Sequence, residues 1–432
     1  MNLANEIPKY FFGYGLAIFP ILLIIGPLVA EIYLLLCIIF AVYSVIKEKN
    51  FKYFNNKFLL FFLLFYLLIL LSTFVNFRDF DNSKSSIFYF RIPLFALSAW
   101  YILDRFKLFN NKILFFYIVF FLFLILDSLI QYYTGKNILG NEVVRSRISS
   151  FFGEELILGG FILRIIPFFL LYLVLNNLIG GNKVNFQYVI LTSLSCLIVY
   201  LSGERTSFFL LILFFFTLYF INKFLRKFII FTMFSFMIFA LVIPHFRVSE
   251  DFNPAIRMFK KSYDQIIGKG EEQYEEHKKK MFNKVYIFSH DHHGHYLLSY
   301  RMFKDHPIIG TGVKGFRYLC RNKIYILEKN DGCSTHPHNT YVQILVSTGL
   351  LGFTLLVIAF AFVVKELFNN RRKLLSIDHP DINQVSTSIM LSAIFVNLWP
   401  LIPSGNFFNN WLSMIYFYPL AYYFYFNFKR NS

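Results

Sequence analysis

Residues 58–76, FLLFFLLFYLLILLSTFVN, form an apolar run that contains no charged side chain. An α-helix needs about 20 such residues to cross the hydrocarbon core of a membrane, and this run has that length. A backbone surrounded by lipid must satisfy its hydrogen bonds internally, which favours a helix. The run therefore predicts a transmembrane helix.

Runs of the same kind recur along the chain. We predict twelve spans, at residues 9–26, 28–46, 58–76, 86–103, 113–133, 155–179, 186–202, 207–222, 228–246, 338–368, 385–403 and 409–427. The chain of 432 residues is 57% hydrophobic and only 16% charged, which is too apolar for a soluble globular domain. The expected fold is an all-α, polytopic integral membrane protein with about 12 transmembrane helices.

Basic residues indicate the orientation of the chain. Loops rich in Lys and Arg mark the cytoplasmic side of a membrane protein, and here they are residues 47–57, 104–112, 222–227, 369–376 and the tail at 429–430. Both termini are therefore expected in the cytoplasm. The large polar segment 247–337, between the ninth and tenth helices, is then expected on the extracytoplasmic side of the membrane.

This pattern divides the chain into residues 1–246 with nine helices, the outer loop 247–337, and residues 338–432 with three helices. The outer loop contains an amphipathic stretch, 271–288, that predicts an interfacial helix. The formal net charge of +17 does not predict nucleic-acid binding, because the basic residues form short clusters between apolar runs. Membrane lipids are the expected partners of these clusters.

Residues 333–352, CSTHPHNTYVQILVSTGLLG, join two histidines to the start of the tenth span. Pro337 suits the first helical position, with His336 or Thr335 near the cap, so His338 is expected in the first turn. The positive end of the helix dipole disfavours imidazolium there. His338 is therefore a candidate general base, and the alternative of a satisfied interfacial histidine stays open.

Two glycines follow in this span. Gly349 is expected on nearly the same helix face as His338, and Gly352 follows about one turn later. Small residues allow a neighbouring helix to approach closely. We therefore interpret both glycines as positioning residues for His338, with simple helix packing as the alternative.

Arg205, in SGERTSFF, stands between two apolar runs with almost no loop around it. An arginine at this depth needs an anionic partner, either Glu204 or a phosphate or diphosphate group that fits the guanidinium fork. A snorkelling arginine is the alternative. Further basic residues on the predicted outer side form a candidate cationic funnel, namely Arg145, Arg147, Arg301, Lys304, Arg317 and Arg321.

The run SHDHHGHY at 289–296 has a composition that suits zinc, but no spaced pair of helical ligands is evident in it. We expect neither a metal nor another cofactor, since glycine loops for phosphate and nucleophile motifs are also missing from the sequence. Cys320 and Cys333 are a candidate disulfide if their loop is extracytoplasmic.

The stretch His338, Asn339, nine residues, Gly349, two residues, Gly352 resembles the H-[NSQ]-x9-GxxG signature of the O-antigen ligases and their O-antigen polymerase relatives. The resemblance extends to KDHPIIGTGVKGF at 304–316, to an arginine after the seventh span, and to a large outer loop before the signature helix. It implies a membrane glycosyltransferase of GT-C-like fold that uses a polyprenyl-diphosphate-linked oligosaccharide.

The resemblance further implies metal-independent, inverting transfer of a glycan from undecaprenyl diphosphate to lipid A core at the periplasmic face. His338 would activate the acceptor hydroxyl, Asn339 and His336 would position it, and Arg205 and Arg147 would bind the diphosphate. The second arginine of the family usually lies further upstream than Arg301 does, and that region here holds His293 and His295. Either Arg301 or a histidine, with His295 as the candidate, therefore takes its role. The alternatives are a polymerase, whose acceptor is a second lipid-linked glycan, and a lipid-linked oligosaccharide transporter.

Overall fold

The computed structural model describes residues 3–76, 80–181, 183–246, 290–325 and 332–428. The chain begins with a broken helical segment formed by α1 (Leu3–Pro8), the π-helix η1 (Lys9–Tyr14), α2 (Gly15–Ala17) and α3 (Phe19–Ile25). The part ending at Ala17 meets α3 at an angle of 72°. Gly26, with φ of +153°, then separates α3 from α4 (Pro27–Glu48).

The remaining described structure is mostly helical. Its helices are η2 (Phe51–Tyr53), α5 (Lys57–Val75), α6 (Phe80–Ile87), η3 (Phe88–Phe90), α7 (Arg91–Phe106), α8 (Asn111–Thr134), η4 (Ser150–Phe152), α9 (Leu158–Leu175), α10 (Phe186–Leu201), α11 (Arg205–Ile221), η5 (Lys223–Leu225), α12 (Arg226–Val242), η6 (Ile243–Phe246), α15 (His290–Asp305), α16 (Gly315–Leu319), α17 (Thr340–Leu375), α18 (Ile382–Asn397) and α19 (Asn410–Phe428). This agrees with the expected all-α fold, to which the described residues add one small element. Strands β1 (Ile179–Gly180) and β2 (Lys183–Val184) pair as a short antiparallel ribbon between α9 and α10.

Within the described residues, seven helices are long and apolar enough to cross a membrane, and the bent pair at the N-terminus makes up to eight. Helices α10 and α11 are apolar but shorter. Each of the twelve predicted runs overlaps helical structure. The chain is thus a polytopic membrane protein, and the number of twelve spans stays a prediction. The predicted interfacial helix at 271–288 lies outside the described residues.

Helix α9 occupies the centre of the bundle, where α8, α10, α11 and α18 pack around it. Helix α19 packs against α7 and α18. Much of this core is aromatic. The hydroxyl of the buried Tyr418 donates to the Leu16 carbonyl at 2.6 Å and lies 2.9 Å from the Tyr422 hydroxyl. Pairing these polar groups is required where no water is available.

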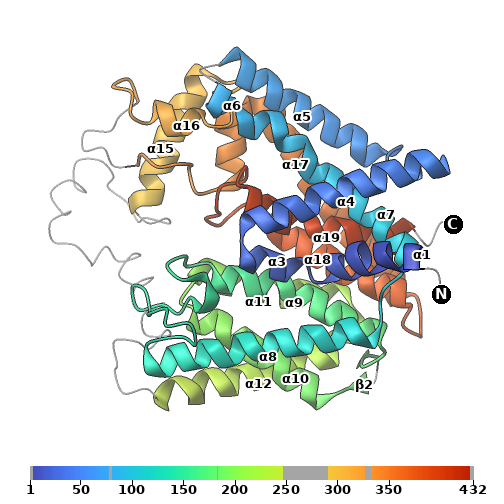
Figure 1. Ribbon diagram of the computed structural model, residues 1–432. Coiled ribbons are helices and arrows are strands. Elements are labelled where there is room, and N and C mark those ends of the chain that lie inside the picture. Colours follow the sequence, from blue (N-terminus) through green and yellow to red (C-terminus); the bar gives the residue numbers. More distant parts are fainter. Residues whose placement is uncertain (1–2, 77–79, 182, 247–289, 326–331, 429–432) are drawn as a thin grey trace.

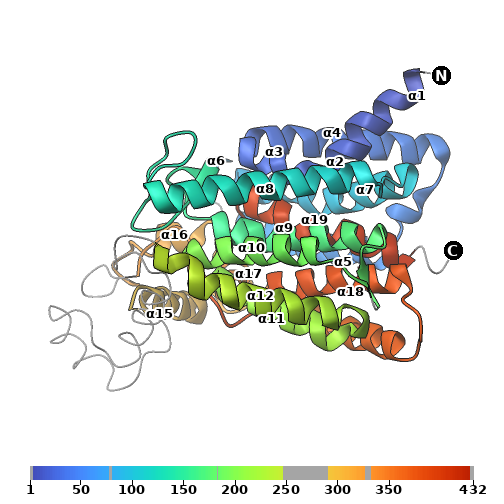
Figure 2. The same ribbon diagram turned by 90° about the horizontal axis from the view of Figure 1, so that it is seen from below.

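The helices run roughly along one common direction, and the ends of the described chain lie at the same end of the bundle (Figures 1 and 2). Helices α15 and α16 lie at the opposite end, together with the turns around 135–155. This separation agrees with the orientation expected from the basic loops. The assignment of α15 and α16 to the periplasmic side remains a prediction.

Helix α17 is broken at Gly349, whose φ of +66° and ψ of −164° are not helical. The turn 307–312 docks at the break: the Leu350 amide donates to the Pro307 carbonyl at 2.8 Å, and the Thr311 amide donates to the Val346 carbonyl at 2.8 Å. The expectation that Gly349 shares a helix face with His338 is therefore wrong, because helical spacing does not continue across the break.

Candidate functional site

Asn339 is the N-cap of α17. Its side-chain oxygen accepts hydrogen bonds from the amides of Tyr341, at 2.9 Å, and Val342, at 3.1 Å. The helix therefore begins at Thr340, three residues after the Pro337 that we expected at its first position, and neither Pro337 nor His338 belongs to its first turn. The reason is that the Asn339 side chain, rather than Thr335 or His336, caps the helix.

His338 precedes this cap in the left-handed region, with φ of +53°. Few residues other than glycine adopt this conformation, and such strain is found preferentially at functional sites. The backbone around it is held from the α18–α19 loop, because the Ser404 amide donates to the His338 carbonyl at 2.8 Å. The Asn339 amide group donates to the carbonyls of Pro400, at 2.8 Å, and Ile402, at 3.0 Å.

Four histidine rings gather around this point, with His338 among them. The ring centroid of His338 lies 4.0 Å from that of His336, 5.1 Å from that of His295 and 5.7 Å from that of His292. The histidine-rich run is thus a helix and not the loop that we expected, because α15 begins at His290. Residues three apart share a helix face, so α15 presents His292 and His295 to the same side.

Hydrogen bonds fix two of these rings. Nδ1 of His295 lies 2.6 Å from the Gly332 carbonyl, and Nδ1 of His336 lies 2.9 Å from the Thr335 hydroxyl. Sequence reasoning missed His292 as a neighbour of His338. The signal was the spacing of His292 and His295, which becomes informative once the run is known to be helical.

The cluster keeps its central histidines neutral. Burial and, secondarily, like-charge repulsion from His336, His295 and His292 together lower the pKa of His338 to about 3. Burial, together with His295 and Arg317, lowers the pKa of His336 to about 4. A hydrogen bond to the Ser404 backbone raises this pKa but does not offset the other effects. The predicted neutrality of His338 thus has a cause other than the helix dipole.

In the part of the chain that the structure describes, no group of three or more His, Cys, Asp or Glu side chains is arranged to hold a metal ion. The structure bonds Cys320 to Cys333 in a disulfide, with the two Cα atoms 5.1 Å apart. This bond ties α16 to the segment that leads into His336. The candidate disulfide is therefore formed.

Arg205 is the first residue of α11, and Arg147 lies close enough to repel it electrostatically. The side chain of Arg147 packs over Gly203. Glu204 lies between them in sequence, but its carboxylate faces the start of α9 and accepts from the amides of Gly159, at 2.7 Å, and Gly160, at 3.0 Å. The expectation that Glu204 is the direct partner of Arg205 is not what the structure shows.

Arg301 and Arg317 occupy different positions in the outer segment. Arg301, on α15, donates to the Tyr325 carbonyl at 3.2 Å. Arg317, on α16, lies near enough to His336 to lower the pKa of that histidine. Arg145 is exposed. His295 and Arg301 are the candidates to replace the second arginine of the family. His295 lies beside His338, whereas Arg301 donates to a backbone carbonyl in the outer segment.

The two signature glycines make room for specific atoms. A side chain at Gly349 would overlap the backbone of Ile308 and Ile309, and one at Gly352 would overlap the side chain of Thr348. Gly352 therefore accommodates its own helix rather than a neighbouring one, contrary to our expectation. Gly349 allows the break in α17 and the docking of the turn 307–312. A positioning role of both glycines for His338 stays a prediction.

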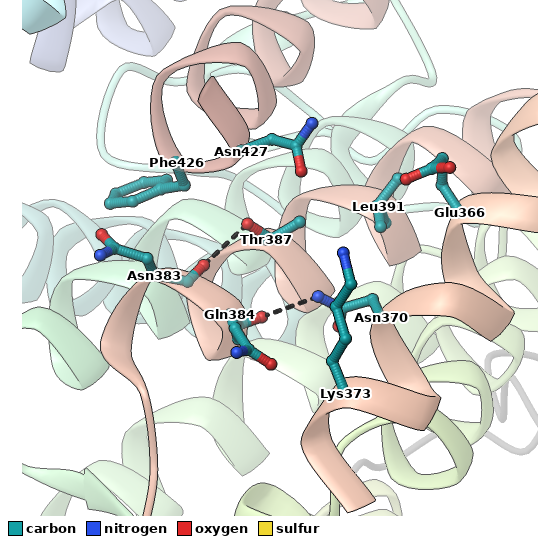
Figure 3. Close-up of a pocket in the computed structure, with 9 residues that line it drawn as sticks. All are labelled: Glu366, Asn370, Lys373, Asn383, Gln384, Thr387, Leu391, Phe426 and Asn427. Carbon is teal, nitrogen blue, oxygen red and sulfur yellow. Dashed lines mark hydrogen bonds between the residues drawn. The ribbon is translucent and has the colours of Figure 1, made fainter. Parts of the chain in front are cut away.

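A separate polar pocket lies between the C-terminal part of α17, the first turns of α18 and the end of α19 (Figure 3). The Asn370 side chain donates to the Gln384 carbonyl at 3.3 Å, and the Thr387 hydroxyl donates to the Asn383 carbonyl at 2.7 Å. Lys373 and Glu366 also line it (Figure 3). This pocket lies at the end of the bundle opposite α15 and is therefore separate from the histidine cluster.

The fold and this site define a polytopic helical membrane protein with a neutral imidazole cluster at one end of its bundle. Residues 190–357 match the family model described as O-antigen ligase. The match includes Arg205, the histidine cluster and the complete glycine signature, and it confirms the resemblance that the sequence motifs carried. It supports a glycosyltransferase-like role in lipopolysaccharide biosynthesis. A comparison with curated proteins finds no match.

Proposed function

We propose that the protein is an O-antigen ligase that transfers a glycan from undecaprenyl diphosphate to lipid A core at the periplasmic face of the inner membrane. The observation that carries this proposal is the family match over 190–357 together with the placement of its signature histidine inside a neutral imidazole cluster. The start of α11, with Arg205, and the turns around 135–155, with Arg147, lie at the same end of the bundle as α15 (Figure 1).

In the proposed reaction an acceptor hydroxyl attacks the anomeric carbon of the donor sugar. The new glycosidic bond forms as the bond to the diphosphate breaks, with inversion. The hydroxyl proton passes to the imidazole of His338, which is neutral and so has a free lone pair. The guanidinium groups of Arg205 and Arg147 bind the departing diphosphate through paired hydrogen bonds.

The charges of the site favour this sequence of events. Without a donor, burial and the neighbouring histidines hold the pKa of His338 low. A bound diphosphate brings negative charge to the site and raises the pKa of an adjacent imidazole. Donor binding would therefore turn His338 into a stronger base when the substrate is in place. His336 and His295 would hold its ring in position.

The proposal is tested with the purified full chain reconstituted with an undecaprenyl diphosphate-linked oligosaccharide and lipid A core. His338→Ala should reduce transfer by about 10²-fold to 10⁴-fold, the usual contribution of a general base. His379→Ala is the matched control, because His379 is exposed in the loop between α17 and α18. Wild-type transfer by His338→Ala would overturn the mechanism.

The choice of acceptor separates a ligase from a polymerase. Both enzymes use the same donor chemistry, so the assay offers lipid A core and a second lipid-linked repeat in parallel. Extension of lipid A core supports the proposal. Extension of the lipid-linked repeat alone would overturn it in favour of a polymerase, and movement of intact donor across the membrane without transfer would favour a transporter.

A further inference from the structure

Arg164 is a charged residue inside the central helix α9, and it has no role in the reaction proposed above. Every other residue from Leu158 to Val174 is buried, whereas Arg164 retains partial exposure. Ionisable residues inside a membrane-spanning helix are costly and are usually functional. It lies six residues after the start of α9, which is about 9 Å along the helix at 1.5 Å per residue.

The guanidinium of Arg164 points back toward the start of α9. One of its nitrogens donates to the Gly160 carbonyl at 2.6 Å, and another donates to the Tyr416 hydroxyl at 3.0 Å. The group also lies over the Tyr416 ring, 4.8 Å from the centroid. Its Nε atom is buried without a hydrogen-bond partner among the described residues. These contacts are all with neutral groups.

Gly160 lies close both to the Arg164 side chain and to the residues around Arg205 at the start of α11. A side-chain carbon placed at Gly160 would lie 3.1 Å from a nitrogen of Arg164, 3.3 Å from the Ser207 hydroxyl and 3.4 Å from the Glu204 carboxylate. Ser207 stands two residues after Arg205 in α11. The junction of α9 and α11 therefore combines Arg164 with the start of the helix that carries Arg205.

The formal charge of this junction is positive. Glu204 supplies a carboxylate there, but that group already accepts two α9 amides and the Ser207 hydroxyl at 2.7 Å. Arg147, Arg205 and Arg164 together outnumber this carboxylate by two charges. An excess of this size matches the double negative charge of the diphosphate diester in the donor. Three guanidinium groups can also contact both of its phosphate groups, whereas a monophosphate offers only one.

We propose that Arg164 is a further binding residue for the donor, contacting the diphosphate from inside the bundle while Arg147 and Arg205 contact it at the rim. The inference rests on the proposed function and specifies how the same donor is held. Arg164 would exchange part of its bonding to Gly160 and Tyr416 for charge-assisted hydrogen bonds to phosphate oxygens, which are stronger than the neutral ones.

The test measures the binding of undecaprenyl diphosphate and undecaprenyl monophosphate, without sugar, to the purified full chain in lipid nanodiscs. Arg164→Gln should weaken diphosphate binding by about tenfold or more, the value of a lost charge-assisted hydrogen bond, and should affect the monophosphate less. Arg164→Lys should lie in between, since it keeps the charge and loses the fork.

Two control variants isolate this effect. Arg371→Gln removes an arginine that also stacks on a ring, with its guanidinium 4.0 Å from the Phe220 centroid at the other end of the bundle, and it should bind both lipids like the wild type. Tyr416→Phe keeps the ring under Arg164, loses the hydroxyl, and should not weaken diphosphate binding.

The outcomes separate the inference from the proposed function. If Arg164→Gln or Arg164→Lys lowers the melting temperature but keeps wild-type affinity and discrimination, Arg164 is structural and the inference is overturned. If the wild type itself does not prefer the diphosphate, the proposed function fails instead. If only the Arg164 variants lose that preference while His338→Ala retains it, the inference stands.

Discussion

The imidazole rings of His336 and His338 lie 4.0 Å apart between centroids, across the single residue Pro337. Two charged imidazoles at this distance would repel each other strongly, and burial adds to the cost of charging either one. The outer end of α17 is therefore built around neutral histidines. This arrangement has a consequence for stability as well as for catalysis.

Stability should fall as the pH is lowered below about 6.5. The pKa values of His336 and His338 in the folded protein, about 4 and about 3, lie below the ordinary value of 6.5. Between these values the unfolded chain takes up protons that the folded chain does not, so acid favours unfolding. Melting temperatures from pH 7 to pH 4 measure this, and His338→Gln should flatten the slope. A slope that stays the same in His338→Gln would show that this histidine is not the source of the acid sensitivity.

Gly349→Ala should destabilise the protein strongly. The backbone at Gly349 has φ of +66° and ψ of −164°, which costs about 1–3 kcal/mol for a residue with a side chain, and the added carbon would also overlap the Ile308 backbone. Gly135→Ala is the control, because Gly135 also has a positive φ, of +83°, but open space around it. The melting temperature of Gly349→Ala should fall well below that of Gly135→Ala. Equal values would argue against the docked turn.

Asn339→Ser should separate the two roles of Asn339. Serine retains an oxygen that caps α17 but lacks the amide NH2 group that donates to both the Pro400 and the Ile402 carbonyl. Asn339→Ala loses both functions. Its free energy of unfolding should be about 1 kcal/mol lower than that of Asn339→Ser, which is the contribution of the cap. Urea unfolding gives these differences. If serine and alanine were equally destabilising, the side-chain oxygen would not be acting as a cap.

Removal of the disulfide should loosen the histidine cluster. Cys320 and Cys333 are 13 residues apart, and a bridge closing a loop of this size contributes about 3 kcal/mol. Gly332, beside Cys333, also holds Nδ1 of His295 at 2.6 Å. A reducing agent should therefore lower both the melting temperature and the transfer rate of the wild type. A Cys320→Ser/Cys333→Ser variant should behave like the reduced protein and should not respond to the reagent, and a wild type that is also unresponsive would contradict this role.

Much of the architecture follows from local sequence. The apolar runs correspond to helices, because the length and hydropathy of a segment are enough to select a helix in lipid. The signature from His338 to Gly352 also led to the histidine cluster, and Arg205 and Arg147 lie close enough to repel each other. The start of α17 was misjudged because proline and asparagine both suit a helix start, and only the backbone bonds identify Asn339 as the cap.

Composition and spacing alone are enough to establish a helical membrane protein with a histidine at the head of a glycine-containing helix. The groups that surround His338, the need for glycine at Gly349, and the way Arg164 faces the junction with α11 emerge only from the folded chain. Those relationships join segments far apart in the chain, such as the turn 307–312 and α17. They depend on packing and backbone hydrogen bonds that no local pattern encodes.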